Sequence, residues 1–507
     1  MMPARGGISL AALSALSAAL GFAIWFALTW ARIGTFEYPL DDVYIHLSMA
    51  EGITGGTYGI NPGEPASAAS SILYPLLLTP FPGTALQRLL PLAWNVGALL
   101  ALSGIMGTWI GRWVADRRLG VFLALVLPFA ANIAGVASLG MEHTLHALAT
   151  VVMLLGFWRF LIKGEVGASL IAGVLLAPML RFEGIGLALV VCEVVALRGS
   201  VRAAAMLAGL ALAPAALFAL FLTSQGLDPL PSSVLAKLST ASDGSDLLSR
   251  LLRNLFSVGA GLLLAGWALL TAGLFHRALK GDHDLRLFLL VAWLAATAHF
   301  LAGRIGWAAR YEHYVVVMIA IALVAVFGKA GRILRGLVIS GALVAAAYYG
   351  LMNWQFYNWT ARGVYLQHVQ MARIAAEMPD APVAVNDIGR VAWAQEARIV
   401  DLWGLAYADA RRARQEAEDG PVPGWAGPLA EARGARYAMV YADWFKDGIG
   451  ADWRLIAELE TPAPIGILGS EKVSIFAIDP TMEDDLRAVI ERLAPSMPEG
   501  TTLIEVN

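Results

Sequence analysis

This 507-residue chain has little charge and almost no cysteine. Asp, Glu, Lys and Arg make up 15% of it, against 58% hydrophobic residues, and the mean hydropathy is +0.64. The net charge of −3 argues against nucleic acid as a partner. The single cysteine, Cys192, excludes a disulfide framework and a cysteine metal site. We find no internal repeat. The composition predicts a polytopic membrane protein whose surroundings are the lipid bilayer.

Apolar runs near the ~20 residues needed to cross a bilayer recur about eleven times. The first covers roughly 8–30, which is longer than the apolar region of a signal peptide and therefore predicts an uncleaved anchor. Two short runs flank Arg181-Phe182-Glu183-Gly184 and predict a hairpin. The later runs cover approximately 84–110, 119–137, 144–162, 167–180, 185–197, 203–223, 254–275, 286–303, 312–328 and 333–352.

The loops between these runs differ in charge. Lys and Arg gather in alternate loops, which the positive-inside rule assigns to the cytoplasm. An odd number of spans then places the N-terminus in the cytoplasm and the C-terminal region outside. We expect a multi-pass protein of the bacterial inner membrane. The polar segments with unusual content all fall on the outer, periplasmic face, so we expect the chemistry there.

The composition changes near Asn358, after which charges become frequent. Short strand-like runs at 382–385, 398–400, 437–441 and 473–478 alternate with helix-like stretches at 407–418 and 482–493. We therefore predict two domains. Residues 1–357 form the transmembrane domain, with a first outer loop at 32–83, and residues 358–507 form an extracytoplasmic α/β domain.

Asp41 and Asp42 stand side by side in the first outer loop. Adjacent carboxylates repel one another, and their desolvation at a membrane boundary is costly. A chemical reason would be that one stays ionised as a base while the other orients it or holds a cation. The alternative is that they cap the following helix, because Asp is favoured at an N-cap. His46 follows Asp42 by four residues, so both share a helical face.

Cations on the outer face also need a reason, because an unpaired charge near a span end is expensive. They could neutralise acidic neighbours, or they could share an anion such as a phosphate held by guanidinium forks and a lysine. Nucleotide sugars are not supplied on that face, which favours a lipid phosphate. The cations are Arg181, Lys237, Arg304 and Arg310, and the acidic neighbours are Asp41, Asp42, Glu142, Glu183 and Glu312.

Two further groups are candidates for binding. His143 and His146 have a spacing that can bind zinc, but no third ligand is evident, so we predict no metal there and favour polar groups of a cavity. Trp393, Trp403 and Trp444 have flat apolar faces that suit the sugar rings of an acceptor, although tryptophans also fill cores.

Several motifs together resemble GT-C glycosyltransferases, with the nearest likeness to the arabinofuranosyltransferase-type group of cell-wall assembly. The resemblance runs along most of the chain, in order. The matching elements are Leu40-Asp41-Asp42-Val43-Tyr44-Ile45, Asn61-Pro62-Gly63-Glu64, Ala69-Ser70-Ser71-Ile72-Leu73, Gly140-Met141-Glu142, Arg181-Phe182-Glu183-Gly184, Leu230-Pro231-Ser232-Ser233 with Lys237, Arg310-Tyr311, Asn386-Asp387-Ile388-Gly389 and Asp401-Leu402-Trp403-Gly404. Ile72 and Phe182 stand where that group often has proline, and Ser232 replaces asparagine.

The resemblance implies a polytopic GT-C-like fold and an inverting transferase of the cell envelope with a polyprenyl-phosphate sugar donor and a glycan or glycolipid acceptor. Asp41 is then the expected general base, with Asp42 beside it. The expected substrate-binding residues are Glu142, His143, Arg181, Glu183, Lys237, Arg310, Tyr311 and His46.

Other readings of the residues stay open. A transporter or flippase for a lipid-linked or anionic solute would also place charges at the membrane, but we find no inverted repeat. A scaffold would leave the carboxylate pair unexplained. The adjacent carboxylates could bind a divalent cation, whereas a base needs no metal. The sequence does not name the sugar, the acceptor or the polyprenol length.

Overall fold

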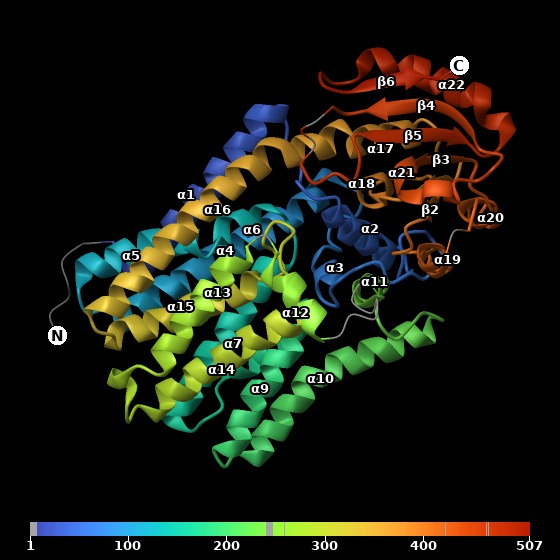
Figure 1. The fold of residues 1–507 in the computed structure, drawn as a ribbon. Helices are drawn as coiled ribbons and strands as arrows, with labels where there is room; N and C mark the ends of the chain where they lie inside the picture. Colours follow the sequence, from blue (N-terminus) through green and yellow to red (C-terminus); the bar gives the residue numbers. More distant parts are fainter. Residues whose placement is uncertain are drawn as a thin grey trace.

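The protein is described by a computed structural model that covers residues 8–239, 247–257, 259–420, 422–462, 464 and 466–506. Apolar helices form a bundle, and the chain ends in a domain built around a β-sheet (Figure 1). Both features confirm the fold class expected from composition.

Each apolar run of the sequence contains a long or shorter helix. Among the described residues, six stretches are long and apolar enough to cross a membrane: α1 (Leu10–Ile33), α4 (Ala85–Trp113), α7 (His143–Lys163), α10 (Val201–Ser224), α14 (His283–Ala302) and the run of α16 (Arg332–Leu366) with α17 (His368–Ala376). Shorter apolar helices are α8 (Ala168–Leu180), α9 (Gly184–Leu197), α13 (Ala260–Leu274) and α15 (His313–Lys329). The helices α8 and α9 flank Arg181, as the hairpin prediction requires.

The predicted run 119–137 is not one helix. The helix α5 (Arg117–Ala130) ends before Asn132, whose φ of 52° is left-handed, and α6 (Ile133–Ser138) follows. Two acceptors at this break are satisfied by α16: Asn353 Nδ2 donates to Asn132 Oδ1 over 2.7 Å, and the Tyr357 hydroxyl donates to the Gly135 carbonyl. Such partners are needed because irregular backbone at membrane depth must be satisfied within the protein.

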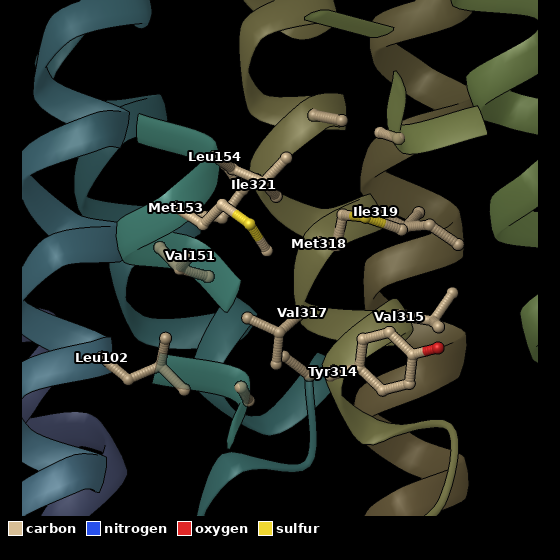
Figure 2. Close-up of a cluster of buried hydrophobic side chains, with 14 of the residues drawn as sticks. Leu102, Val151, Met153, Leu154, Tyr314, Val315, Val317, Met318, Ile319 and Ile321 are labelled. Carbon is tan, nitrogen blue, oxygen red and sulfur yellow. The ribbon is translucent and has the colours of Figure 1, made fainter. Parts of the chain in front are cut away.

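Buried apolar side chains of α4, α7 and α15 pack together within the bundle. Figure 2 shows Leu102 of α4 and Val151 of α7 on the side that faces Val317 of α15. Close approach of α7 and α8 depends on glycine: a Cβ on Gly173 would lie 2.4 Å from the Cα of Met153. Small residues of this kind let membrane helices pack backbone to backbone.

The C-terminal domain has a six-stranded sheet in the order β2-β1-β3-β5-β4-β6. The strands β2, β1 and β3 are parallel, and β5, β4 and β6 are antiparallel. The bounds are β1 (Val383–Val385), β2 (Ile399–Asp401), β3 (Tyr437–Val440), β4 (Arg454–Glu460), β5 (Lys472–Ala477) and β6 (Thr502–Glu505). The sequence predicted β1, β2, β3 and β5, and it predicted α19 (Ala408–Asp419) and α22 (Glu483–Leu493). It missed β4 and β6.

One helix joins the two parts of the chain. α16 has 35 residues and runs without a break through residue 358, where the composition changes. At a rise of 1.5 Å per residue it is about 50 Å long, well beyond the ~30 Å of a hydrocarbon core. It therefore carries the chain out of the apolar bundle to the sheet (Figure 1).

The first loop packs against the sheet domain. It contains α2 (Asp42–Thr54) and α3 (Tyr74–Leu77). Asn61 acts on the edge strand β2 as a neighbouring strand would: its amide accepts from the Ile399 N–H over 3.0 Å and donates to the Ile399 carbonyl over 2.8 Å. Glu64 forms ion pairs with Arg398 and Arg433. The Asn-Pro-Gly-Glu element thus covers a sheet edge that would otherwise be open for pairing.

Candidate active site

A cavity of about 360 Å³ lies where the first loop, the α14–α15 loop and the C-terminal domain meet. Most of the charged groups singled out in the sequence line it, together with some that were not. Its charged lining residues are Asp41, Asp42, Asp387, Arg181, Arg304, Arg310 and Arg414. The concentration of charge in a chain with so little of it marks this cavity as the candidate site.

Asp41 does not cap the helix that follows it, as the alternative reading supposed. Its side chain makes no capping bond to α2. Its two oxygens instead accept from the N–H groups of Gly389 and Arg390, both over 2.7 Å, at the start of α18 (Gly389–Ala392). The carboxylate is buried, at 8% exposure, and its orientation is set by the C-terminal domain.

His368 stands between two carboxylates. Its Nδ1 lies 3.1 Å from Asp41 Oδ1, and its Nε2 lies 3.4 Å from Asp387 Oδ2 and 2.8 Å from the Tyr441 hydroxyl. Burial raises the pKa of Asp387, and the neighbouring His368 opposes this rise. Asp41, His368 and Asp387 offer ligand atoms within 4.8 Å of one another, a spacing that a cation could bridge. The histidine already directs a different ring nitrogen at each carboxylate.

Asp42 and Arg310 form an ion pair inside the cavity. Arg310 Nη2 lies 2.6 Å from Asp42 Oδ2, and the Asp42 side chain is 42% exposed. Arg310 itself is buried, and its Nε and Nη1 have no hydrogen-bond partner in the described part of the chain. The residues just before it, Trp307 to Ala309, have left-handed φ angles of 50°, 63° and 56°. Such strain typically marks a backbone held in place by its surroundings.

Glu142 and Arg181 form a second, deeper ion pair. Both are buried, and Arg181 Nη1 donates to Glu142 Oε1 over 2.7 Å. Arg181 also pairs with Glu183 through Nη2 over 2.7 Å and contacts His143 Nε2 at 3.0 Å. Its guanidinium is therefore largely engaged by the protein. His46 and Tyr311 line the same cavity, and Arg310 lies over the Tyr311 ring at 5.1 Å.

The structure treats Lys237 and the three candidate tryptophans differently from the residues above. Lys237 belongs to α11 (Ser232–Ser239), but its side chain lies outside the described residues. Trp393 is not exposed for an acceptor: it is 5% exposed, and its indole N–H donates to Gln87 Oε1 over 3.0 Å. Trp403 and Trp444 do line the cavity, with ring centroids 4.6 Å apart.

The C-terminal domain supplies its part of the site from one edge of the sheet. Asn386 and Asp387 follow β1, Trp403 follows β2, and Trp444 follows β3. These are the carboxyl ends of the three parallel strands, where α/β sheets commonly bind ligands. The sequence identified the motif at Asp387 without a role, and it missed His368, which has no motif around it.

The fold is similar to that of two crystal structures of ArnT from Cupriavidus metallidurans. One, bound to undecaprenyl phosphate, has a TM-score of 0.52 and 14% sequence identity, covering 92% of this chain and 98% of that chain. The other, in the apo state, has a TM-score of 0.50 and 13% identity with the same coverage. The likeness shows that this chain has an ArnT-like fold. Residues 331–476 match a family described as Domain of unknown function (DUF8728). No curated protein matches the chain in sequence.

The buried pair gives a stability prediction. Arg181→Met should leave Glu142 buried without its cation and lower the free energy of unfolding by about 3–5 kcal/mol. The measurement is thermal unfolding in detergent, with Arg412→Met as the matched control, because Arg412 pairs with Asp409 on the surface and should matter little. Equal melting temperatures for the two variants would contradict the prediction.

Proposed function

We propose that this protein is an inverting glycosyltransferase that moves a sugar from a polyprenyl-phosphate donor to a hydroxyl of a glycan or glycolipid on the outer face of the membrane. The observation that carries the proposal is the pairing of Asp42 with Arg310, beside Asp41, in one cavity. The ArnT structure with bound undecaprenyl phosphate supports the donor class, since its fold is similar. The membrane-spanning helices support the lipid bilayer as partner.

The reaction has two electrostatic needs. The acceptor oxygen attacks the anomeric carbon, its proton must go to a base, and the bond to the phosphate oxygen breaks. The departing phosphate gains negative charge and needs a fixed cation. Arg310 meets the second need, because two of its nitrogens, Nε and Nη1, are buried without partners among the described residues and the residue lines the cavity. Lys237, on α11, is proposed to assist it.

Asp41 is the proposed base. Two N–H groups and His368 fix its carboxylate, which leaves one lone pair of Oδ2 for a hydroxyl. The same contacts set the orientation of the Asp41 carboxylate. Asp42 is more exposed to the cavity than Asp41, and we propose that it binds the acceptor or orients Asp41. A donor with a pentofuranose sugar is proposed from the arabinofuranosyltransferase-like motifs alone.

The carboxylate pair gives the first test. Asp41→Asn should reduce turnover at least ~10²-fold while donor binding persists, because an amide cannot take the proton. Asp42→Asn should be harmful but less so. Sugar transfer from a radiolabelled polyprenyl-phosphate donor in membranes measures both variants. If Asp42→Asn is the inactive variant and Asp41→Asn retains turnover, the base is Asp42. Transport of a lipid without sugar transfer would instead support the flippase alternative.

The cation gives the second test. Arg310→Ala should lower kcat/KM by roughly two to three orders of magnitude, equivalent to ~3–4 kcal/mol, and Lys237→Ala should act similarly. Arg310→Lys should rescue only in part, because an ammonium lacks the bidentate fork. Thermal stability is measured on the same purified proteins. Stable variants with normal kinetics would defeat the phosphate assignment.

The orientation of the site gives the third test. In a Cys192→Ser background, Gly420→Cys should react with an impermeant thiol reagent added outside intact cells whose outer membrane has been removed. Gly420 ends α19, and a side chain there would meet no atom within 4 Å, so the change is tolerated. Arg117→Cys, at the exposed first residue of α5, is the matched control and should react only after lysis. Labelling at position 420 only after lysis would place the site in the cytoplasm.

A further inference from the structure

The protonation state of His368 can be derived from its hydrogen-bond partners. Gln367 Nε2 donates to the Ser470 carbonyl over 2.9 Å, so the amide oxygen of Gln367 faces the other way. That oxygen lies 2.5 Å from the Tyr441 hydroxyl and accepts its proton. A second carboxyl-type acceptor, Asp387 Oδ2, lies 3.4 Å from the same hydroxyl. With either acceptor, the Tyr441 proton is used away from His368.

It follows that the Tyr441 oxygen accepts from His368. The two atoms are 2.8 Å apart, so His368 Nε2 must carry the hydrogen. The carboxylate of Asp387, 3.4 Å from the same nitrogen, favours the same tautomer. The proton on Nε2 is therefore fixed by three groups of the C-terminal domain.

The other ring nitrogen then meets Asp41. In a neutral ring with its hydrogen on Nε2, Nδ1 would present a lone pair to Asp41 Oδ1 at 3.1 Å, and the two would repel one another. Both residues are buried, at 2% and 8% side-chain exposure, so water does not screen this contact. When Nδ1 also holds a proton, the ring is a cation and the contact with the Asp41 carboxylate is an attractive ion pair.

We propose that His368 is a positioning residue for the transfer: it donates from Nε2 to Tyr441 and, with Nδ1 also protonated, forms an ion pair with Asp41. It so holds the first-loop carboxylate in place against the C-terminal domain. This inference rests on the proposed function and extends it to a residue outside the predicted motifs. Loss of the Nδ1 proton at high pH should release Asp41. The titratable groups that face His368 are Asp41, Asp387 and Tyr441.

Two substitutions separate the two ring nitrogens. The amide nitrogen of asparagine can occupy the place of Nδ1, so His368→Asn keeps an N–H group beside Asp41 that does not titrate. The amide nitrogen of glutamine can occupy the place of Nε2, so His368→Gln keeps only the bond to Tyr441. His283→Asn, at the exposed start of α14, is the control for a histidine away from the site.

The experiment measures kcat and KM for sugar transfer, and the melting temperature, from pH 6 to about 9.5, a range that brackets the ordinary histidine pKa. His368→Gln should lose about 10²-fold in kcat with little change in KM. His368→Asn should stay within about tenfold, since a neutral donor bonds a carboxylate less strongly than a charged one. The wild type should lose turnover as the pH rises through the deprotonation of His368, and His368→Asn should lack this fall.

The outcomes separate the inference from the proposed function. Equal kinetic losses in the Asn and Gln variants, with an unchanged alkaline fall, would overturn the positioning role while the transferase proposal stands. If the wild type transfers no sugar from any polyprenyl-phosphate donor, the proposed function fails, and melting temperatures decide the inference. Then the wild-type melting temperature should fall with rising pH more than that of His368→Asn. Parallel curves would reject the Nδ1 contact.

Discussion

The architecture of the site depends on the hydrogen bonds between the Asp41 carboxylate and the backbone of the C-terminal domain. Asp41 belongs to the first loop, yet its oxygens satisfy the first N–H groups of α18. The approach is so close that a Cβ on Gly389 would lie 2.1 Å from the Asp41 carbonyl oxygen. Asn61 and Glu64 repeat the arrangement farther along the same loop, on β2 and on Arg398. These contacts hold the first-loop wall of the cavity against the C-terminal domain.

Within that frame, the buried charges divide into two kinds. Arg181 forms ion pairs with Glu142 and Glu183, so its charge is neutralised within the protein, and these pairs hold the wall of the cavity together. Arg310 has one carboxylate partner and two buried nitrogens without partners in the described residues. The cost of leaving such groups unsatisfied is high in a buried site. A ligand that supplies anionic oxygens would offset this cost. We therefore expect substitution of Arg310 to affect turnover and substitution of Arg181 to affect stability.

Local pattern was enough to predict the apolar helices, the hairpin at Arg181 and four strands, because each is encoded by hydrophobic runs of characteristic length. The local sequence pattern did not predict the features that long-range contacts determine. The break at Asn132 is stabilised by Asn353, and β4 and β6 are recruited by pairing with β5 and with each other. His368 could not be found because its partners, Asp41 and Tyr441, lie far away along the chain. Trp393 was misjudged because its burial comes from Gln87 and Tyr44.

Because α16 is continuous, its length and helical rotation set how the C-terminal half of the site is aligned with the first loop. The helix runs from Arg332 to Leu366, and His368 follows two residues later. Each residue of an α-helix turns the chain by about 100° and advances it by about 1.5 Å. Inserting one residue in the membrane half of α16 would therefore rotate the sheet domain by more than a quarter turn relative to the bundle, carrying His368 and Asp387 away from Asp41. Inserting a full heptad would nearly restore the angle but lift the domain by about 10 Å. The length of this helix is thus itself a determinant of the site.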